Sequence, residues 1–458
     1  MHSVPDKPKK YAPKPNLWAF FVALSLALLK NGGKMCYIIP QTLLTETDYD
    51  VLRYHLSKFT TIEKLITFGG KMFIGRGLKE NKPVATSSLI IVIKKQTPDI
   101  NHKTKIMQYK PYLAVSEEEK FKKYLHSPKN RQEKYILQKE LCKNFENWNF
   151  INHDKDVVAF FNLYKQNSID LSIYYNHILA KTEFGDVFYF DAGFTLDKSK
   201  YSDAELENAY KLVYIDNNKY LLKNYHYYPK TEKILVPQGS QGLKCLDKKY
   251  KIVWRKTFAE KTKFNFCELS DIILDTGLQF ISSDNKSEIL FLLALLNSKT
   301  NTFLLDKMLK LAHEQKGIFI VIKRLKNFVR IPKITPENQH LKAKIIELTQ
   351  NLLDLENVKL DDLVDFSGLM VQKFENVQAV GTHLIVTFNG KDYKLPIKEK
   401  AEFVNKLISE KYYDNSLNFN VKNVTLQELK NLEAIDFEEQ EELKTQIDDL
   451  ISVLYFGR

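Results

Sequence analysis

The feature that most constrains the fold is a pair of apolar runs separated by two glycines. Residues 17–29 (LWAFFVALSLALL) carry no charged side chain and end at the sequence KNGG, which is typical of a helix C-terminus followed by a turn. Residues 35–39 (MCYII) follow at once and predict a buried strand. An apolar helix, a turn and an apolar strand form the basic core unit of an α/β domain.

The first run has a second interpretation as a signal peptide, because Lys9, Lys10 and Lys14 precede it. No small-x-small cleavage pattern follows, and the run is short for a bilayer span. We therefore expect a buried helix and no membrane contact. The four cysteines are scattered and form no CxxC pair, which argues against a zinc site or a disulfide framework and favours a cytoplasmic protein.

Two further strands are predicted at residues 62–68 and 87–93, and the second is apolar on both faces. Strands of that kind belong to mixed or parallel sheets that helices cover on both sides. We predict an α/β class with a partial Rossmann-like sheet, followed by an α+β part and a C-terminal region of helices and a hairpin. The expected division is 1–100, a helical connection at 101–175, 176–335 and 336–458.

Later elements are predicted from periodicity and turn chemistry. Apolar patterns predict helices at 287–297 and 301–313, and an amphipathic helix at 438–454. Within residues 377–397, Asn389-Gly390 separates two alternating segments and predicts a hairpin with a type I′ turn.

The charge is unevenly distributed along the chain. Lys and Arg number 68 against 56 Asp and Glu, a formal net charge of +12. Residues 401–458 hold six basic and twelve acidic side chains, so the excess of positive charge lies in the first 400 residues. A basic body of this size favours a polyanionic partner. Only seven of the basic residues are Arg, which favours phosphate contacts over the reading of guanine edges.

One stretch, residues 218–263, interleaves lysines with tyrosines and a tryptophan. Lysines bind phosphates, and aromatic rings pack on sugars or bases, so this stretch is a candidate DNA-binding surface. A solvated basic face over a strand-rich core is the alternative. A second, shorter basic cluster has the same two interpretations. The candidate DNA-binding residues of the two clusters are Lys249, Lys251, Arg255, Lys256, Lys323 and Arg324.

Several segments of the chain form an ordered series of motifs. They are residues 16–33, 35–44 (MCYIIPQTLL), Tyr49, Leu52 and Arg53, 68–73 with 84–92, 249–256 (KYKIVWRK), 291–299 (FLLALLNSK), 326–332 (KNFVRIP) and 454–457. In this order they resemble the C-terminal half of the catalytic domain of adenine-specific DNA methyltransferases, the class that includes the TaqI methyltransferase and the Eco57I-like restriction-modification enzymes.

The resemblance implies a fold, a cofactor and a site. Residues 1–100 would be half of a catalytic domain, 176–335 a target-recognition domain, S-adenosylmethionine the methyl donor and double-stranded DNA the partner. The family flips the adenine out of the duplex, and a hairpin aromatic that matches Phe73 supports the base. Lys71, Arg76 and Lys79 lie beside Phe73 and could hold phosphates. Core packing of Phe73 and a merely solvated loop are the alternatives.

The departure from the family is that its two signature elements are missing. No Asn, Asp or Ser precedes a Pro-Pro-Tyr or Pro-Pro-Phe anywhere in the chain, and no Gly-rich cofactor loop follows a first strand. We therefore expect a separate chain, or a missing N-terminal part, to bind S-adenosylmethionine. The alternatives are a non-catalytic DNA-binding or specificity subunit and an inactive truncated product. Pro98-Asp99 with Glu118-Glu119-Lys120 also matches a bare nuclease pattern, which is common in a chain rich in Lys and Glu.

Overall fold

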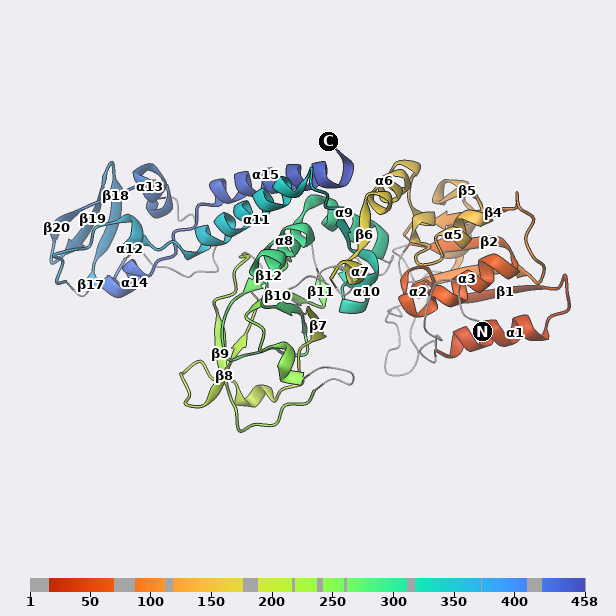
Figure 1. Cartoon of the computed structure of the whole chain (residues 1–458), viewed down its shortest axis with the longest axis horizontal. Helices are drawn as coiled ribbons and strands as arrows, with labels where there is room; N and C mark the ends of the chain where they lie inside the picture. The colour runs from red at the N-terminus through yellow and green to blue at the C-terminus, as the bar shows by residue number, and fades with distance from the viewer. Residues whose placement is uncertain are drawn as a thin grey trace.

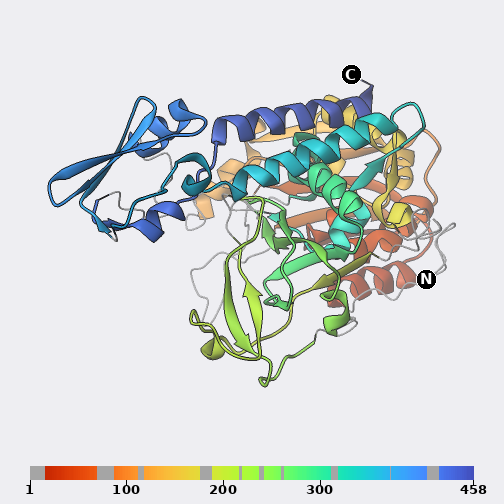
Figure 2. The same cartoon turned by 60° about the vertical axis from the view of Figure 1, so that its left-hand side comes forward.

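The computed structural model describes residues 16–69, 87–111, 118–175, 188–215, 219–236, 242–258, 262–310, 318–371, 373–409 and 422–457. An N-terminal sheet with its helices lies at one end, a strand-rich body lies in the middle, and a small lobe lies at the other end (Figure 1). The turned view shows the same three parts, with two long helices running between the body and the small lobe (Figure 2).

The N-terminal sheet has five strands in the order β1-β3-β2-β4-β5. Strand β3 lies between β1 and β2 and is antiparallel to both, so β1 and β2 run parallel to each other. The next strand, β4, is parallel to β2, and β5 is antiparallel to β4. The strands predicted at 35–39, 62–68 and 87–93 are confirmed. The five are β1 (Lys34–Pro40), β2 (Thr61–Phe68), β3 (Ser88–Lys94), β4 (Lys103–Tyr109) and β5 (Arg131–Leu137).

Helices pack on one face of this sheet. Val22 of α1, Leu56 of α3 and Leu141 of α5 belong to the same buried cluster as Leu65 and Ile91 of the strands. On the opposite face β3 is only partly buried, and Ile38 of β1 is 57% exposed. The prediction that helices cover both faces is therefore wrong for the described residues. These helices are α1 (Leu17–Leu28), α2 (Thr42–Thr45), η1 (Thr47–Tyr49), α3 (Asp50–Phe59) and α5 (Gln138–Lys143).

The prediction of a mostly helical connection at 101–175 is wrong for β4 and β5, which continue the sheet past residue 100. β4 (KTKIMQY) and β5 (RQEKYIL) each begin with charged and polar residues and contain no long apolar run, so neither carries the pattern by which the other strands were predicted. The other elements of this range are α4 (Glu118–His126), η3 (Pro128–Asn130), η4 (Asn149–Asn152), α6 (Lys155–Gln166), β6 (Ser168–Asp170) and α7 (Leu171–Ile173).

The strand-rich body is built on a four-stranded sheet, β12-β10-β14-β7, and a three-stranded sheet, β13-β8-β9. The strands are β7 (Tyr189–Ala192), β8 (Ala209–Val213), β9 (Tyr225–Pro229), β10 (Tyr250–Arg255), β11 (Thr257–Phe258), β12 (Asn265–Cys267), β13 (Ile272–Ile273), β14 (Leu278–Ser283), β15 (Ile318–Phe319) and β16 (Arg330–Pro332). The short helices η7 (Lys198–Lys200) and η8 (Gly242–Cys245) connect them.

Two predicted helices of the body are confirmed as α8 (Lys286–Asn297) and α9 (Lys299–Leu309), whereas α10 (Ile322–Phe328) was not expected. Asn285 caps α8 by accepting the Glu288 N–H, and Ser298 caps α9 by accepting the Asn301 N–H. The apolar residues of α8 are buried in the same cluster as the N-terminal sheet, so the sheet and the body share one core.

The remaining residues form a long helix pair and the small lobe, which has its own buried cluster. The pair is α11 (Gln339–Asp354) and α15 (Phe437–Phe456), which lie side by side (Figure 2). Asn389 and Gly390 have φ of 47° and 68°, which confirms the predicted type I′ hairpin. The lobe contains η9 (Leu355–Asn357), α12 (Leu360–Leu363), β17 (Lys373–Phe374), β18 (Asn376–Val380), β19 (His383–Phe388), β20 (Lys391–Pro396), α13 (Ala401–Ser409), β21 (Val424–Thr425) and α14 (Leu426–Lys430).

In the described part of the chain, no single helix is long and apolar enough to cross a membrane. The bent pair α8 and α9 passes that test together by length and composition only.

A buried guanidinium organises the turn between β1 and α3. Arg53 is fully buried, and its Nη1 donates to the Leu43 carbonyl at 2.7 Å and to the Glu46 carbonyl at 2.9 Å. It also donates to the carbonyls of Phe145 and Glu146, 92 and 93 residues away in sequence. One side chain therefore fixes two distant backbone segments, and each carbonyl would lose a charged donor if Arg53 were removed.

We predict that Arg53→Leu lowers the free energy of unfolding of the shared core by about 3 kcal/mol or more, because several buried carbonyls lose a charged donor. Urea unfolding followed by tryptophan fluorescence measures this, since buried Trp148 lies close in sequence to the two distant carbonyls. Arg255→Leu, at an exposed arginine, is the matched control and should change the midpoint little. Equal midpoints for the two variants would contradict the role of Arg53.

Candidate active-site edge and nucleic-acid surface

Three parallel strands of the N-terminal sheet end at one edge. These strands, β1, β2 and β4, end at Pro40, Phe68 and Tyr109, and the antiparallel β3 begins there with Ser88. In open α/β sheets, ligands bind beyond the carboxyl ends of the parallel strands. We call the edge where these strands end the carboxyl edge, and it is the candidate active-site region of the described chain.

Gln41 holds the carboxyl edge together. Its side-chain amide nitrogen donates to the Phe68 carbonyl and to the Ser88 carbonyl, both at 3.0 Å. Its backbone N–H donates to the Ser87 carbonyl at 2.9 Å. Gln41 is 2% exposed, so these bonds form out of contact with water. The ends of β1 and β2 and the start of β3 are thus fixed by one side chain.

Aromatic rings line the same edge. The rings of Phe68 and Tyr109 are stacked, with centroids 5.3 Å apart and an interplanar angle of 14°. The Gly69 N–H donates to the Tyr109 carbonyl at 2.9 Å, and a Cβ at Gly69 would come within 2.7 Å of the Pro111 nitrogen. Glycine is required there because two backbone segments of the same chain approach each other closely. The packing leaves Phe68 buried, as expected for a residue inside a strand.

Several predicted site residues cannot be placed. Phe73, Lys71, Arg76 and Lys79 lie outside the described residues, within the segment that follows β2 in sequence. Lys323 lies on α10, but its side chain is also outside the description.

The carboxyl edge is tied to the body by asparagine side chains. The Asn149 amide donates to the carbonyls of Lys307, Met308 and Lys310 at the end of α9, at 3.0–3.3 Å. The Asn147 amide donates to the Met308 carbonyl at 3.1 Å. These bonds satisfy carbonyls that a helix C-terminus leaves without partners. The edge and the body are therefore held in a fixed relation.

Arg324 is part of this junction, which corrects its place in the candidate DNA-binding set. It is 4% exposed and pairs with the Glu46 carboxylate, beside the turn that Arg53 fixes. A buried guanidinium that is paired within the fold cannot reach a phosphate without leaving its partner. Its departure would leave the partner carboxylate without a counter-charge. The structure assigns Arg324 to the contact between the sheet and α10.

Lys251 is corrected for the same reason. It is the second residue of β10 and is 2% exposed, and its Nζ donates to the Lys249 carbonyl. Burial lowers the pKa of Lys251, since the charged ammonium is poorly solvated there. The sequence pattern placed this residue on the basic surface, but the strand turns it inward.

The other predicted residues of β10 and its end are accessible. Lys249 is exposed, lies 5.1 Å from the ring centroid of Tyr250, and forms an ion pair with Glu268 at 3.5 Å. Arg255 is exposed and donates to the Ile215 carbonyl at 3.2 Å. Lys256 is partly buried. These three side chains can contact a polyanion, although the Glu268 carboxylate offsets part of the charge.

A further group of basic and aromatic side chains lies on and beside β8 and β9. Of these two strands, only β9 falls within residues 218–263, the candidate DNA-binding stretch predicted from the sequence. Lys211 lies 5.1 Å from the ring centroid of Tyr225, and Lys230 lies 5.1 Å from that of Tyr210. The rings of Tyr214 and His226 are stacked at 4.7 Å. Cross-strand neighbours create these pairs, so only the strand register could have revealed them.

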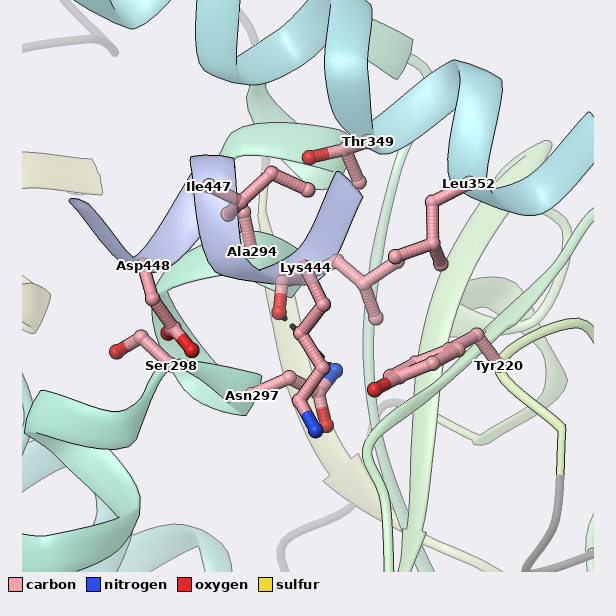
Figure 3. Close-up of a pocket in the computed structure, with 10 residues that line it drawn as sticks. Tyr220, Ala294, Asn297, Ser298, Thr349, Leu352, Lys444, Ile447 and Asp448 are labelled. Carbon is pink, nitrogen blue, oxygen red and sulfur yellow. Dashed lines mark hydrogen bonds between the residues drawn. The ribbon is translucent and has the colours of Figure 1, made fainter. Parts of the chain in front are cut away.

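A small, partly open cavity lies between α8, α11 and α15 and is lined in part by Asn297, Lys444 and Asp448 (Figure 3). Its volume is about 20 Å³, enough for about one water molecule and too small for a nucleoside cofactor. Asp448 accepts the Lys299 N–H at 2.8 Å, and burial raises the pKa of its carboxyl. S-adenosylmethionine therefore does not fit this cavity. Among the described residues, no cluster of three or more His, Cys, Asp or Glu side chains could hold a metal ion.

Comparison with known proteins gives one family match. The model of the Eco57I restriction-modification methylase family matches residues 4–73, which run from before α1 to just beyond β2. No curated protein matches the sequence. The chain is thus related to this methylase family over its first part.

Solved structures of restriction-modification enzymes are similar to the chain at low identity. They include the type IIL enzyme MmeI in complex with DNA (TM-score 0.45, 10% identity, 96% of this chain and 50% of that chain). They also include the DrdV–DNA complex (0.42, 10%, 96% and 51%) and the type IIG restriction endonuclease BpuSI (0.29, 11%, 95% and 49%). The chain spans about half the length of the structures it matches.

We predict that Gln41→Met lowers the free energy of unfolding by about 2 kcal/mol, since two buried carbonyls lose their donor. The substitution keeps the length of the side chain and removes its polar group. Amide hydrogen exchange should increase at the ends of β1 and β2 and not in the distant lobe. Unchanged exchange at both strand ends would contradict the role given to Gln41.

For nucleic acid, we predict that Lys249→Gln with Arg255→Gln weakens binding to a generic DNA duplex. Each lost phosphate contact should reduce the slope of log affinity against log salt concentration by about 1. Fluorescence anisotropy over a range of NaCl concentrations measures the slope. Lys251→Met is the matched control, with an unchanged slope because its ammonium is buried. A slope that falls for Lys251→Met alone would contradict this assignment.

Proposed function

We propose that this chain is a component of a site-specific DNA adenine-N6 methyltransferase of a restriction-modification system. In this proposal the chain binds double-stranded DNA and supports the flipped adenine at the carboxyl edge. A second polypeptide, or an N-terminal part outside this sequence, binds most of the S-adenosylmethionine. Both would act in the cytoplasm.

The observation that carries the proposal is the position of the family match within the sheet. Residues 4–73 include α1, β1, α3 and β2, and the match ends just after β2 reaches the carboxyl edge. The matched segment thus contains the ends of two parallel strands, which lie on the side of the sheet where α/β proteins bind ligands.

The chemistry requires an extruded base, because the N6 amine must lie in line with the methyl group that S-adenosylmethionine supplies. In the transfer, the methyl carbon would bond to N6, the carbon–sulfur bond would break to leave S-adenosylhomocysteine, and the proton lost from N6 would pass to water. In this proposal Phe73 supports one face of the base, and Gln41 keeps the strand ends in place. Lys249 and Arg255 contribute phosphate contacts that hold the duplex.

The second candidate function is a non-catalytic DNA-binding or specificity subunit. The sequence favours it in one respect, because no Pro-Pro tetrapeptide occurs in the 458 residues. The two candidates differ in whether a cofactor-binding polypeptide is required. The first requires one for methyl transfer, and the second predicts DNA binding with no such polypeptide.

We predict no tritium transfer from labelled S-adenosylmethionine to DNA by this chain alone. Transfer should appear when the polypeptide encoded immediately upstream is added. Phe73→Ala should then reduce transfer by about tenfold or more while DNA affinity changes little, because the base loses its stacking partner. Clear transfer by the isolated chain would contradict the need for a partner, and full transfer by Phe73→Ala would contradict the placement of the base.

A further inference from the structure

Many apolar side chains are exposed around β1. We call this region the β1 rim: it consists of α1, the outer backbone edge of β1 and the open sheet face beside β1. Six of the 18 large apolar side chains that are exposed among the described residues lie on α1 and β1, within 22 residues of sequence. They are Leu17, Phe20, Phe21, Leu24 and Leu28 on α1, and Ile38 on β1. Exposed apolar side chains concentrated in one region mark an interaction site.

Helix α1 is apolar around its whole circumference. Ala19 and Val22 pack into the shared core, and Ser25 is hydrogen-bonded to the Tyr37 hydroxyl of β1 at 2.6 Å. Leu17, Phe20, Leu24 and their neighbours form a stripe on the other side, spaced as one helix face. A helix that is apolar all round is normally buried on all sides. In Figure 1, α1 instead lies at the periphery beside β1.

The sheet face opposite α1 is also apolar near β1. Paired residues form two rows across the strands, Cys36–Val92–Lys64–Lys105–Tyr135 and Ile38–Ile90–Ile66–Met107–Glu133. Each row is mostly apolar on β1 and β3. On β4 and β5, the Lys105 ammonium pairs with the Glu133 carboxylate at 2.7 Å. The face therefore changes from apolar at β1 to charged at β5.

The two outer strands of the sheet are built differently. In the described sheet, β1 and β5 are the edge strands. Natural edges are protected by charged side chains, and the first four residues of β5 (RQEKYIL) include three of them, Arg131, Glu133 and Lys134. After Lys34, the first residue of β1, the rest of that strand (MCYIIP) is uncharged. The backbone edge of β1 is thus suited to pairing with another strand.

We propose that the β1 rim is the docking surface for the cofactor-binding polypeptide, which continues the sheet at β1 and places helices on both faces there. This inference rests on the proposed function. It commits to an α/β partner because apolar surface lies on three sides of β1: on α1, at the backbone edge and on the opposite sheet face. A strand at the edge with helices above and below covers all three.

Other occupants cover less of this surface. A second copy that pairs antiparallel through β1 would continue the sheet but would bring no helix to the open face, since its own face is open on the same side. A lipid surface would cover α1 and leave the backbone edge of β1 without hydrogen-bond partners. The three-sided pattern favours an α/β partner over both.

The test uses the full chain and the polypeptide encoded immediately upstream. Cys36 is exposed on the open face, Cys142 is partly buried, and Cys245 and Cys267 are buried. Alkylation measured at the Cys36 peptide by mass spectrometry therefore reports on coverage of the rim. We expect the partner to slow Cys36 alkylation by about tenfold or more and to protect the β1 amides from hydrogen exchange. Ile38→Asp should weaken association by about tenfold or more.

Tyr135→Asp is the matched control, because Tyr135 is 62% exposed on the same face but lies on charged β5. It should leave association unchanged, and both variants should keep the wild-type unfolding midpoint. No association, or association with β1 and Cys36 unprotected, overturns the docking surface. Shielding of Cys36 in the isolated chain at a dimer mass also overturns it, since the occupant is then a second copy.

The outcomes separate this inference from the proposed function. Methyl transfer by the pair without protection of β1 overturns the docking surface and leaves the function standing. Protection of β1 that Ile38→Asp abolishes, with no methyl transfer to DNA, supports the docking surface and overturns the function.

Discussion

Burial of apolar surface around the N-terminal sheet is the constraint on which the rest of the structure depends. On one face, α1, α3 and α5 pack against the strands, and this core continues without a break into α8 of the body. Arg53 and the asparagines near residue 149 then fix the backbone at the junction through buried hydrogen bonds. The carboxyl edge and the strand-rich body are therefore joined by one core and by buried hydrogen bonds. In the proposed function, this junction would hold the duplex and the extruded base in a fixed relation.

The same constraint explains the asymmetry of the sheet. On the side of the body the apolar core is covered, and at β5 charged side chains protect the edge of the sheet. Toward β1, apolar side chains remain exposed on the helix and on the open face. Apolar area left in water forgoes about 25 cal/mol per Å², so a surface of this extent is costly unless a partner covers it. The position of this surface beside the carboxyl edge links the proposed docking to the proposed chemistry.

Part of this architecture could be predicted from the sequence. Strong apolar patterns located α1, β1, β2, β3 and α8, and turn chemistry located the Asn389-Gly390 hairpin. The strands β4 and β5 were missed because each begins with charged and polar residues, a composition that also suits an exposed helix. The inward positions of Lys251 and Arg324 depend on strand register and on a distant Glu46, and neither can be read from local sequence. An apolar strand also does not reveal whether both of its faces are covered.

The most direct test of the central claim, that this chain completes an active site at the carboxyl edge, is hydrogen exchange in the reconstituted pair. Exchange is compared with and without S-adenosylhomocysteine and a DNA duplex. The account predicts added protection at residues 38–44 and 65–69, where β1 and β2 reach the edge. Protection confined to the strand-rich body, with none at these strand ends, would contradict the claim and favour a subunit that only binds DNA.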